Sequence, residues 1–397
     1  MQKTSARLNN IAESATLAMA RMGRELKEKG VQVISLSLGE PDFNTPDFIK
    51  EAAKKAIDEN YTRYMAVNGY VDLRESIAHK FKRDNGLTYT AEQIVVSTGA
   101  KQSIMNVVMA LINPGDEVII PAPYWVSYAE MVRLAEGIPV IVNTGIEKDF
   151  KASASDIEPH INTKTKLLMF SSPCNPSGSV YTYEEMSKIA QLLAKNKHVT
   201  AISDEIYEHI NFTGKHCSLA SFSEVYEQTV TVNGVSKAFA MTGWRLGYIG
   251  APLWIAQACT KLQGQFTSGA NGITQRAAKA AIDADPSVTH SMRDTFLKRR
   301  DLMLTKLSEI PGLVCNVPQG AFYLFPDVSS YFGKSANGKT INNAYELSLY
   351  LLEDAHVAVV SGEAFGNAEC IRLSYAASDE ELTEAANRLK IALANLA

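Results

Sequence analysis

The sequence predicts an α/β protein with a large domain, built on a mostly parallel seven-stranded sheet, and a smaller α+β domain. Short apolar runs bounded by turn residues alternate with longer stretches of helical period, which is typical of parallel strands joined by crossover helices. The chain has 397 residues, more than the roughly 250–300 residues at which a single core stops growing. Two domains are therefore expected.

Seven apolar runs are the expected strands of the large domain. They lie at residues 93–97, 117–121, 139–143, 166–171, 199–203, 229–233 and 245–250. Sheets of this kind gather their functional groups at the carboxyl ends of the strands. The residues that directly follow these runs are therefore the ones expected to carry chemistry.

The pattern changes beyond about Pro286. A long charged helix that contains Arg299 comes first, and an amphipathic helix at 379–396 closes the chain. Short strands are expected between them at 313–317, 321–325, 357–360 and 371–375. This division gives three expected units: a large domain at 50–285, a small domain at 286–397, and a segment at 1–49 that packs with the small domain.

Composition excludes several classes of function. Hydrophobic residues make up 46% of the chain and charged residues 21%, as in ordinary globular proteins. The net charge of -4 disfavours a nucleic-acid partner. The five cysteines are dispersed and form no CxxC pair, which indicates reduced thiols and no metal site. No leader and no run of about 18 apolar residues is present, so cytoplasmic residence is expected.

The strongest motif follows the apolar run 229–233 and contains Lys237 and Arg245. A lysine that forms a Schiff base must lose its proton, so it belongs at a strand end, in a partly desolvated cleft near other cations. Lys237 has this placement. A surface lysine in a loop is the ordinary alternative for any single lysine, and the neighbouring motifs argue against it.

Asp204 follows the apolar run 199–203, in the sequence Ser-Asp-Glu-Ile-Tyr. A carboxylate at a strand end can keep the nitrogen of a pyridine ring protonated, which makes the ring an electron sink. A helix N-cap is the alternative for Asp204 considered alone, because aspartate often accepts backbone N–H bonds at the start of a helix.

Two turns supply further polar groups. The turn at 172–178 is made rigid by proline and glycine and projects the Asn175 amide. The segment 97–102 joins a strand to an expected helix at 101–112, whose free N–H groups can cradle a phosphate. Lys101 lies in the first turn of that helix and opposes the helix dipole, so a cofactor phosphate or a substrate carboxylate would stabilise it.

These motifs and two others, Gly39-Glu40-Pro41-Asp42-Phe43 and Arg372-Leu373-Ser374-Tyr375, occur in one order along nearly the whole chain. In that order they resemble the class I aminotransferases of the PLP-dependent (pyridoxal 5'-phosphate) transferase fold type I, and above all their bacterial aspartate/prephenate branch. Two departures bear on the phosphate contacts and the turn: Gly99-Ala100-Lys101 replaces Ser-Gly-Thr of a distant branch, and Cys174 stands where many relatives carry Asn.

The resemblance implies three catalytic residues: Lys237, Asp204 and Tyr207. Lys237 is expected to form the Schiff base with PLP and to move the substrate's α-proton, and Asp204 to pair with the ring nitrogen. Tyr207 and Asn175 are expected to bind the ring oxygen. Ser236 is a further candidate hydroxyl donor.

The remaining implied contacts concern the ring face, the phosphate and the substrate. Trp125 is expected to stack on the ring, with core packing as its alternative, and Tyr64 to reach the phosphate of a neighbouring subunit in a homodimer. Arg372 is expected to grip the α-carboxylate with its planar fork. The expected cofactor contacts are Lys237, Ala100, Lys101, Trp125, Asn175, Asp204, Tyr207, Arg245 and Tyr64; the expected substrate contacts are Gly39, Trp125, Asn175, Arg372, Lys101 and Thr16.

Lys101 and Thr16 bind a distal carboxylate in the branch that this chain resembles, which favours aspartate and 2-oxoglutarate as substrates. Prephenate or aromatic transamination is the alternative, and a PLP-dependent lyase is a more remote one. A PLP-binding regulator fused to a DNA-binding domain would need an extra basic N-terminal domain, for which we see no room. A nicotinamide dehydrogenase would need GxGxxG after the first strand, and this chain lacks it.

Overall fold

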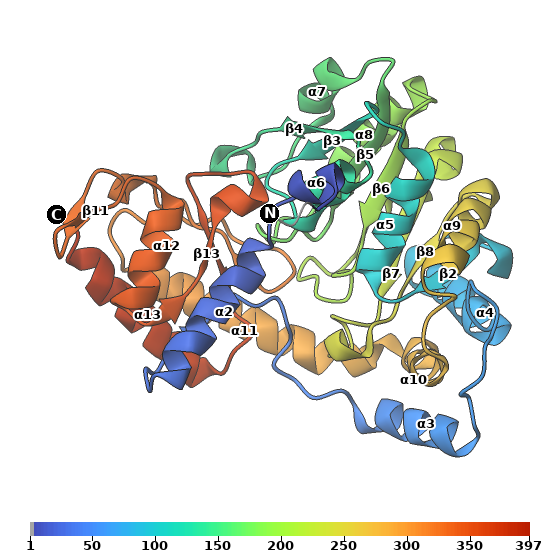
Figure 1. Cartoon of the computed structure of the whole chain (residues 1–397), viewed down its shortest axis with the longest axis horizontal. Helices are drawn as coiled ribbons and strands as arrows, with labels where there is room; N and C mark the ends of the chain where they lie inside the picture. The colour runs from blue at the N-terminus through green and yellow to red at the C-terminus, as the bar shows by residue number, and fades with distance from the viewer. Residues whose placement is uncertain (1–3) are drawn as a thin grey trace.

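A computed structural model describes residues 4–397, and its larger part contains the predicted seven-stranded sheet (Figure 1). The strand order is β2-β8-β7-β6-β5-β3-β4. All seven predicted runs are strands of this sheet, so the predicted α/β class is confirmed. Their bounds are β2 (Ile94–Ser97), β3 (Glu117–Pro121), β4 (Ile138–Val142), β5 (Thr165–Ser171), β6 (Thr200–Asp204), β7 (Thr229–Gly234) and β8 (Gly247–Gly250).

The sheet is buried on both faces. In β3, Val118 and Ile120 belong to one apolar cluster and Ile119 belongs to another, because successive side chains point to opposite faces of a strand. Helices cover both faces, and α5 packs against α9 while α10 packs against α3. These helices are α3 (Asp47–Asp58), α4 (Val71–Lys80), α5 (Ala100–Leu111), α6 (Ser127–Leu134), α8 (Tyr183–Lys195), α9 (Leu253–Phe266) and α10 (Gly272–Asp283).

Strand β8 runs antiparallel to both of its neighbours, β2 and β7. Gly247 at its beginning therefore pairs with Gly234 at the end of β7. As a result Arg245, which precedes β8, reaches the same edge of the sheet as Lys237, which follows β7. The antiparallel strand thus adds a cation to the edge where the parallel strands end.

The C-terminal part is built from three main helices and short strands. The helices are α11 (His290–Leu307), α12 (Ala344–Glu353) and α13 (Asp379–Ala394), and the strands β13 (Val360–Ser361), β14 (Ile371–Ser374) and β9 (Tyr323–Leu324) form one antiparallel sheet in that order. This part packs around its own apolar cluster, which includes Phe296, Leu347 and Leu389.

Two strand predictions in this part need correction. Residues 313–317 make only an isolated bridge, Val314 to Asp327; both Val314 and Val317 are exposed, and Pro318 lacks the N–H that a longer ladder would need. The run 357–360 is two strands instead of one. Its first half, β12 (Val357–Ala358), pairs with β1, and its second half, β13, pairs with β14.

The N-terminal segment lies against the C-terminal part. Strand β1 (Ile34–Ser35) pairs in parallel with β12, with Ile34 opposite Val357. Helix α2 (Ala15–Glu28) packs on β12 and β13, and Figure 1 shows it beside that part while α3 lies by α10. The domain boundaries at 49 and 285 stay a prediction. Among residues 4–397, none of the helices is long and apolar enough to span a membrane.

Candidate active site

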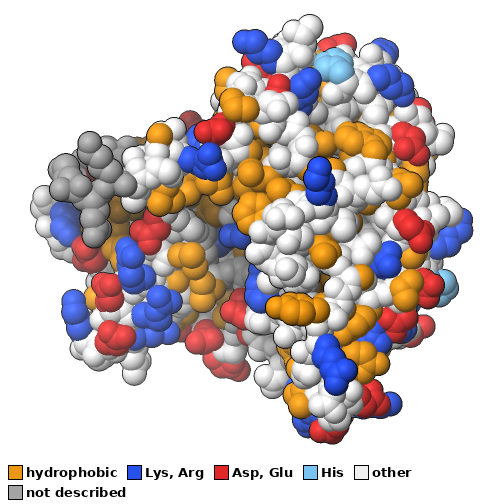
Figure 2. All heavy atoms as spheres, turned by 45° about the vertical axis from the view of Figure 1, so that its right-hand side comes forward, with side chains coloured by type: hydrophobic (Ala, Val, Ile, Leu, Met, Phe, Trp, Pro, Cys, Tyr) orange, Lys and Arg blue, Asp and Glu red, His pale blue; other side chains and the backbone are white. Residues whose placement is uncertain are grey.

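A cavity opens at the carboxyl edge of the sheet and is walled by both parts of the chain. The surface is hollowed between the two parts, and Lys or Arg side chains are visible inside the hollow (Figure 2). All but one of the predicted site residues line this cavity: Thr16, Gly39, Ala100, Lys101, Trp125, Asn175, Asp204, Tyr207, Lys237, Arg245 and Arg372. Ser236 lines it as well.

Tyr64 is the exception. Its side chain is 97% exposed, and it is not among the residues that line the cavity. The structure describes a single chain, so the predicted contact of Tyr64 with a neighbouring subunit stays a prediction.

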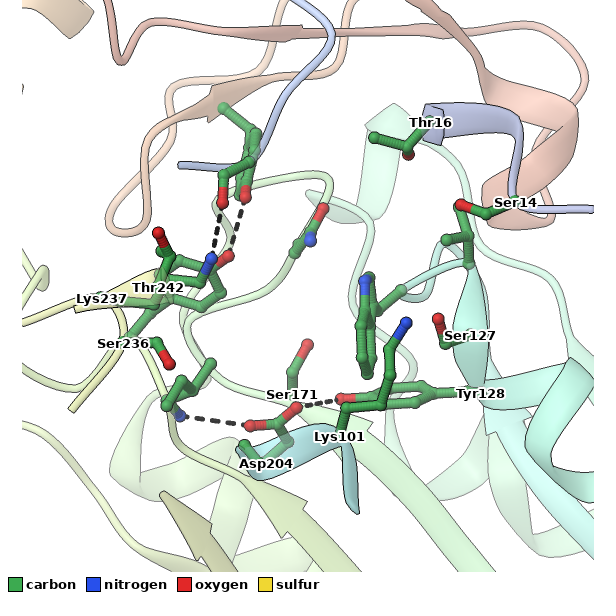
Figure 3. Close-up of a pocket in the computed structure, with 18 of the residues that line it drawn as sticks. Ser14, Thr16, Lys101, Ser127, Tyr128, Ser171, Asp204, Ser236, Lys237 and Thr242 are labelled. Atoms are coloured by element: carbon green, nitrogen blue, oxygen red, sulfur yellow. Dashed lines mark hydrogen bonds between the residues drawn. The ribbon is translucent and has the colours of Figure 1, made fainter. Parts of the chain in front are cut away.

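Lys237 projects into the cavity from the segment after β7 (Figure 3). Its Nζ donates a hydrogen bond to the carbonyl oxygen of Gly39 at 2.5 Å. Withdrawal from water lowers the pKa of Lys237 to about 8, and the positive charges of Arg372 and Arg245 contribute to this. At pH 7 roughly a tenth of this lysine is therefore the neutral, nucleophilic amine, far more than for a lysine in water.

Asp204 is the last residue of β6 and is buried at the floor of the cavity. Its Oδ2 accepts a hydrogen bond from the Tyr128 hydroxyl at 2.7 Å, and its Oδ1 accepts one from the Ile206 N–H at 3.2 Å. Burial raises the pKa of Asp204 to about 6, against the opposing effect of the Tyr128 hydrogen bond. The helix-cap alternative is wrong, because residues 206–209 form a turn.

Arg372 lies on β14 and is 1% exposed. Its guanidinium donates to Oδ1 of Asn175 at 2.9 Å and to the carbonyl oxygen of Ser37 at 2.5 Å. The group is held between the rings of Tyr323 and Phe365, 4.6 and 4.7 Å from their centroids. Both hydrogen-bond acceptors are neutral oxygens, so a buried cation faces the cavity without an anionic hydrogen-bond partner in the described chain. An anionic ligand would supply the missing charge.

A second group of cations surrounds the start of α5. Gly99 has a φ of 86°, and a Cβ there would lie 2.5 Å from Nη2 of Arg245. Glycine thus lets the guanidinium approach the free N–H groups at the helix N-terminus, a combination that suits a phosphate. Lys101 Nζ lies 4.9 Å from the ring centroid of Trp125, and its pKa is lowered by partial burial and then by Arg245.

The cavity also contains residues that the sequence did not point to. Tyr128 contacts Asp204 and packs edge to face on Trp125, with ring centroids 5.6 Å apart. The two tyrosine hydroxyls of Tyr207 and Tyr323 are 2.8 Å apart. Tyr128 lies in the first turn of α6 and three residues after Trp125. This spacing places the two side chains near each other, and it is a signal that could have identified Tyr128. The other additional lining residues are Ser14, Leu17, Val126, Ser127, Ser171, Ile206 and Thr242.

The family model for "Aminotransferase class I and II" matches residues 31–389 of this chain. A bifunctional aspartate aminotransferase and glutamate/aspartate-prephenate aminotransferase of Petunia hybrida is 49% identical over 99% of this chain and 83% of its own length. A probable aspartate/prephenate aminotransferase of Rickettsia bellii is 48% identical over 100% of both chains.

Solved structures show the same relationship. The aspartate aminotransferase of Rhizobium meliloti superposes with a TM-score of 0.97 at 40% identity, over 100% of both chains. The aspartate aminotransferase of Thermus thermophilus with maleate superposes with a TM-score of 0.92 at 39% identity, over 99% of this chain and 100% of that one.

Proposed function

This chain belongs to the class I and II aminotransferases, and from that premise we propose that it transfers the amino group of L-aspartate to 2-oxoglutarate, giving oxaloacetate and L-glutamate. Enzymes of this class depend on PLP. The observation that carries the substrate proposal is the presence of two separate cations in one cavity, Arg372 and Lys101. Arg372 has Asn175 and two aromatic rings around it, whereas Lys101 lies over Trp125. A substrate with two carboxylates uses both cations.

The residues of the cavity fit PLP. Asp204 would pair with the ring nitrogen, Asn175 and Tyr207 would bind the ring oxygen, and Trp125 would cover a ring face. The cradle formed by Gly99, Arg245 and the N–H groups of Ala100 and Lys101 would take the phosphate. When bound, PLP supplies a conjugated ring that accepts electron density from the α-carbon of the substrate.

The chain's own residues then bind, orient and move protons. Lys237 would hold the cofactor covalently, and its amine, whose pKa is lowered in the ligand-free chain, would accept the α-proton of the substrate and return it. The Gly39 carbonyl oxygen orients that amine. Asp204 stabilises positive charge at the ring nitrogen as a carboxylate, and Tyr128 holds the carboxylate in place.

Arg372 and Lys101 set the orientation of the substrate. Arg372 would bind the α-carboxylate, and Lys101 with Thr16 would bind the distal one. Figure 3 shows Ser14 and Thr16 across the cavity from Lys237 and Asp204. An amino acid held at both ends presents its α-carbon to Lys237 in one position, which is the benefit of two-point binding.

We also propose a homodimer in the cytoplasm. The exposed side chains of Tyr64 and Phe266 lie on segments that meet, because Gly264 and Gly269 pack against Val67. Exposed aromatic side chains on neighbouring segments suit a protein interface. All five cysteines are free thiols, which supports a reducing compartment. Sedimentation velocity and cell fractionation test the two proposals.

The substrate proposal is tested by measuring kcat/KM with 2-oxoglutarate and a panel of amino donors. We expect aspartate to exceed alanine, tyrosine, kynurenine and cystathionine. Prephenate with aspartate as donor is the second candidate activity, because relatives such as the Rickettsia bellii protein carry both substrates in their names. An enzyme that is active with monocarboxylic donors and inactive with aspartate would contradict the proposal.

A further inference from the structure

Tyr323 is a fully buried residue that joins the two halves of the cavity. It lies on β9 in the C-terminal part, whereas Tyr207 follows β6 of the large sheet. Their hydroxyl oxygens are 2.8 Å apart, and their side chains are 0% and 3% exposed. This contact is therefore a direct hydrogen bond across the boundary between the two parts.

The position of the Tyr323 side chain is fixed from three directions. Its backbone pairs with Ser374 of β14, the strand that carries Arg372, and its ring covers the guanidinium of Arg372 at 4.6 Å. A Cβ at Gly39 would overlap the hydroxyl oxygen of Tyr323, so only glycine allows the loop of Gly39 to pack against this hydroxyl. That loop also holds Lys237 through the Gly39 carbonyl oxygen.

A neutral tyrosine hydroxyl has one proton to donate and lone pairs that accept. Burial raises the pKa of Tyr207 and of Tyr323, so both remain protonated at neutral pH. If Tyr207 gives its proton to an oxygen of a bound ring, it cannot also donate to Tyr323. The short contact between the two hydroxyls then requires Tyr323 to donate and Tyr207 to accept.

We propose that Tyr323 is a positioning residue, whose hydroxyl donates to Tyr207 and thereby directs the proton of Tyr207 toward the ring oxygen of bound PLP. The proposal rests on the proposed function, which assigns Tyr207 to that oxygen. Hydrogen bonds in a buried chain polarise one another, so Tyr323 also strengthens the bond that Tyr207 makes. Its effect should therefore depend on Tyr207.

The test is Tyr323→Phe in the PLP-loaded protein, which removes the hydroxyl and keeps the ring over Arg372. A hydrogen bond to the ring oxygen favours the form in which that oxygen is more negative. Because a neighbouring hydrogen bond strengthens another by about 10–30%, weakening this bond should raise the pH midpoint of the visible absorption band by roughly 0.1 to 0.3 pH unit. We expect kcat to fall while KM for aspartate changes less than twofold, because Arg372 keeps its packing. The Kd of PLP for the apoprotein should rise.

Tyr375→Phe is the matched control. Tyr375 is buried in the same apolar cluster and donates to the Ala321 carbonyl oxygen at 3.2 Å, and it is not one of the residues that line the cavity. The control removes one buried hydroxyl of the same kind, so it should match Tyr323→Phe in thermal stability and leave the absorption midpoint unchanged. An equal shift in both variants would contradict the proposal.

Two further variants, Tyr207→Phe and the double variant with Tyr207→Phe and Tyr323→Phe, distinguish the role of Tyr323 from the assignment of Tyr207 to the ring oxygen. If Tyr323 acts through Tyr207, the double variant should have the midpoint of Tyr207→Phe alone. A further shift on adding Tyr323→Phe would show independent action and overturn the inference while leaving the proposed function intact. A Tyr207→Phe variant with an unchanged midpoint would overturn the inference together with the assignment of Tyr207 to the ring oxygen, whereas the proposed function is tested separately by the panel of amino donors.

Discussion

The hydroxyl group of Tyr128 donates a hydrogen bond to Oδ2 of Asp204 at 2.7 Å, and neither side chain is more than 5% exposed. The other carboxylate oxygen has only a longer contact with the Ile206 N–H. Asp204 is thus held as a carboxylate in surroundings that disfavour its charge, and a cation placed beside it would relieve that cost.

Asp204→Ala should therefore lower kcat/KM by several orders of magnitude. The carboxylate and a protonated ring nitrogen form a charge-assisted pair, and a loss of about 4 kcal/mol in the transition state corresponds to roughly a thousandfold. Asp204→Glu keeps the charge and should retain part of the activity. Steady-state kinetics with aspartate measure both variants, and full activity in Asp204→Ala would reduce Asp204 to a structural residue.

The stability of the apoprotein should depend on pH through the same group. Burial raises the pKa of Asp204 to about 6, so the folded state binds this proton more tightly than the unfolded state does. The stability that comes from protonated Asp204 is present below pH 4 and is lost as the pH rises through 6. The wild type should therefore lose stability relative to Asp204→Asn as the pH rises from 5 to 8. The difference in free energy of unfolding should change by about 1–3 kcal/mol in favour of the variant.

Urea unfolding of both apoproteins at the two pH values measures this gain. The holoproteins are the control, because a cationic ring nitrogen beside Asp204 would remove most of the penalty for its ionisation. A difference between variant and wild type that is the same at pH 5 and pH 8 would show that Asp204 does not titrate in this range.

Borohydride should fix PLP on Lys237. Reduction removes the conjugated link to the amine, so the visible band should move to the ultraviolet, and mass spectrometry should find a phosphopyridoxyl group on Lys237. Because its pKa is lowered to about 8, attachment of PLP to the apoprotein should quicken as the pH rises through 8. Lys237→Ala should abolish turnover, and the exposed Lys261 supplies the control, Lys261→Ala. A label on any other lysine would disprove the assignment.

Lys101→Ala should lower the efficiency with aspartate much more than with alanine. Lys101 can form an ion pair only with the dicarboxylic donor. Because Lys101 is exposed in the isolated chain, the charged hydrogen bond should contribute about 1.5 kcal/mol, so its loss should lower kcat/KM for aspartate roughly tenfold. The ratio of kcat/KM values for the two donors is the measurement. Arg245→Lys is the comparison, because weaker phosphate binding should depress both donors alike. Equal losses of kcat/KM for aspartate and alanine in Lys101→Ala would assign Lys101 to cofactor binding instead of substrate binding.

Most cavity residues could be predicted because they follow strands of one sheet. Asp204 ends β6, Asn175 and Lys237 follow β5 and β7, and parallel strands bring such positions to one edge. Arg245 reaches that edge for the opposite reason, since it precedes an antiparallel strand. Period and turn residues were enough to find these runs, whose strands are four to seven residues long.

Tyr323 and the division of 357–360 could not be predicted, because they depend on pairings between distant segments. A strand is predicted at 321–325 and contains β9, but its apolar pattern does not show that the Tyr323 side chain contacts Tyr207 and Arg372, both far away in the sequence. Within 357–360, the continuous apolar pattern is the same for one strand as for two strands in different sheets. Only the partners, β1 and β14, distinguish the cases.

The pairing of Ile34 with Val357 also has a consequence for synthesis on the ribosome. Strand β1 emerges early and has no partner until Val357 has been made, whereas the seven-stranded sheet can already assemble. Closing a loop of this length has a large entropic cost and slows folding. The contact between the Ser37 carbonyl oxygen and Arg372 can therefore form only near the end of translation, so a nascent chain would complete the binding site for the substrate carboxylate last.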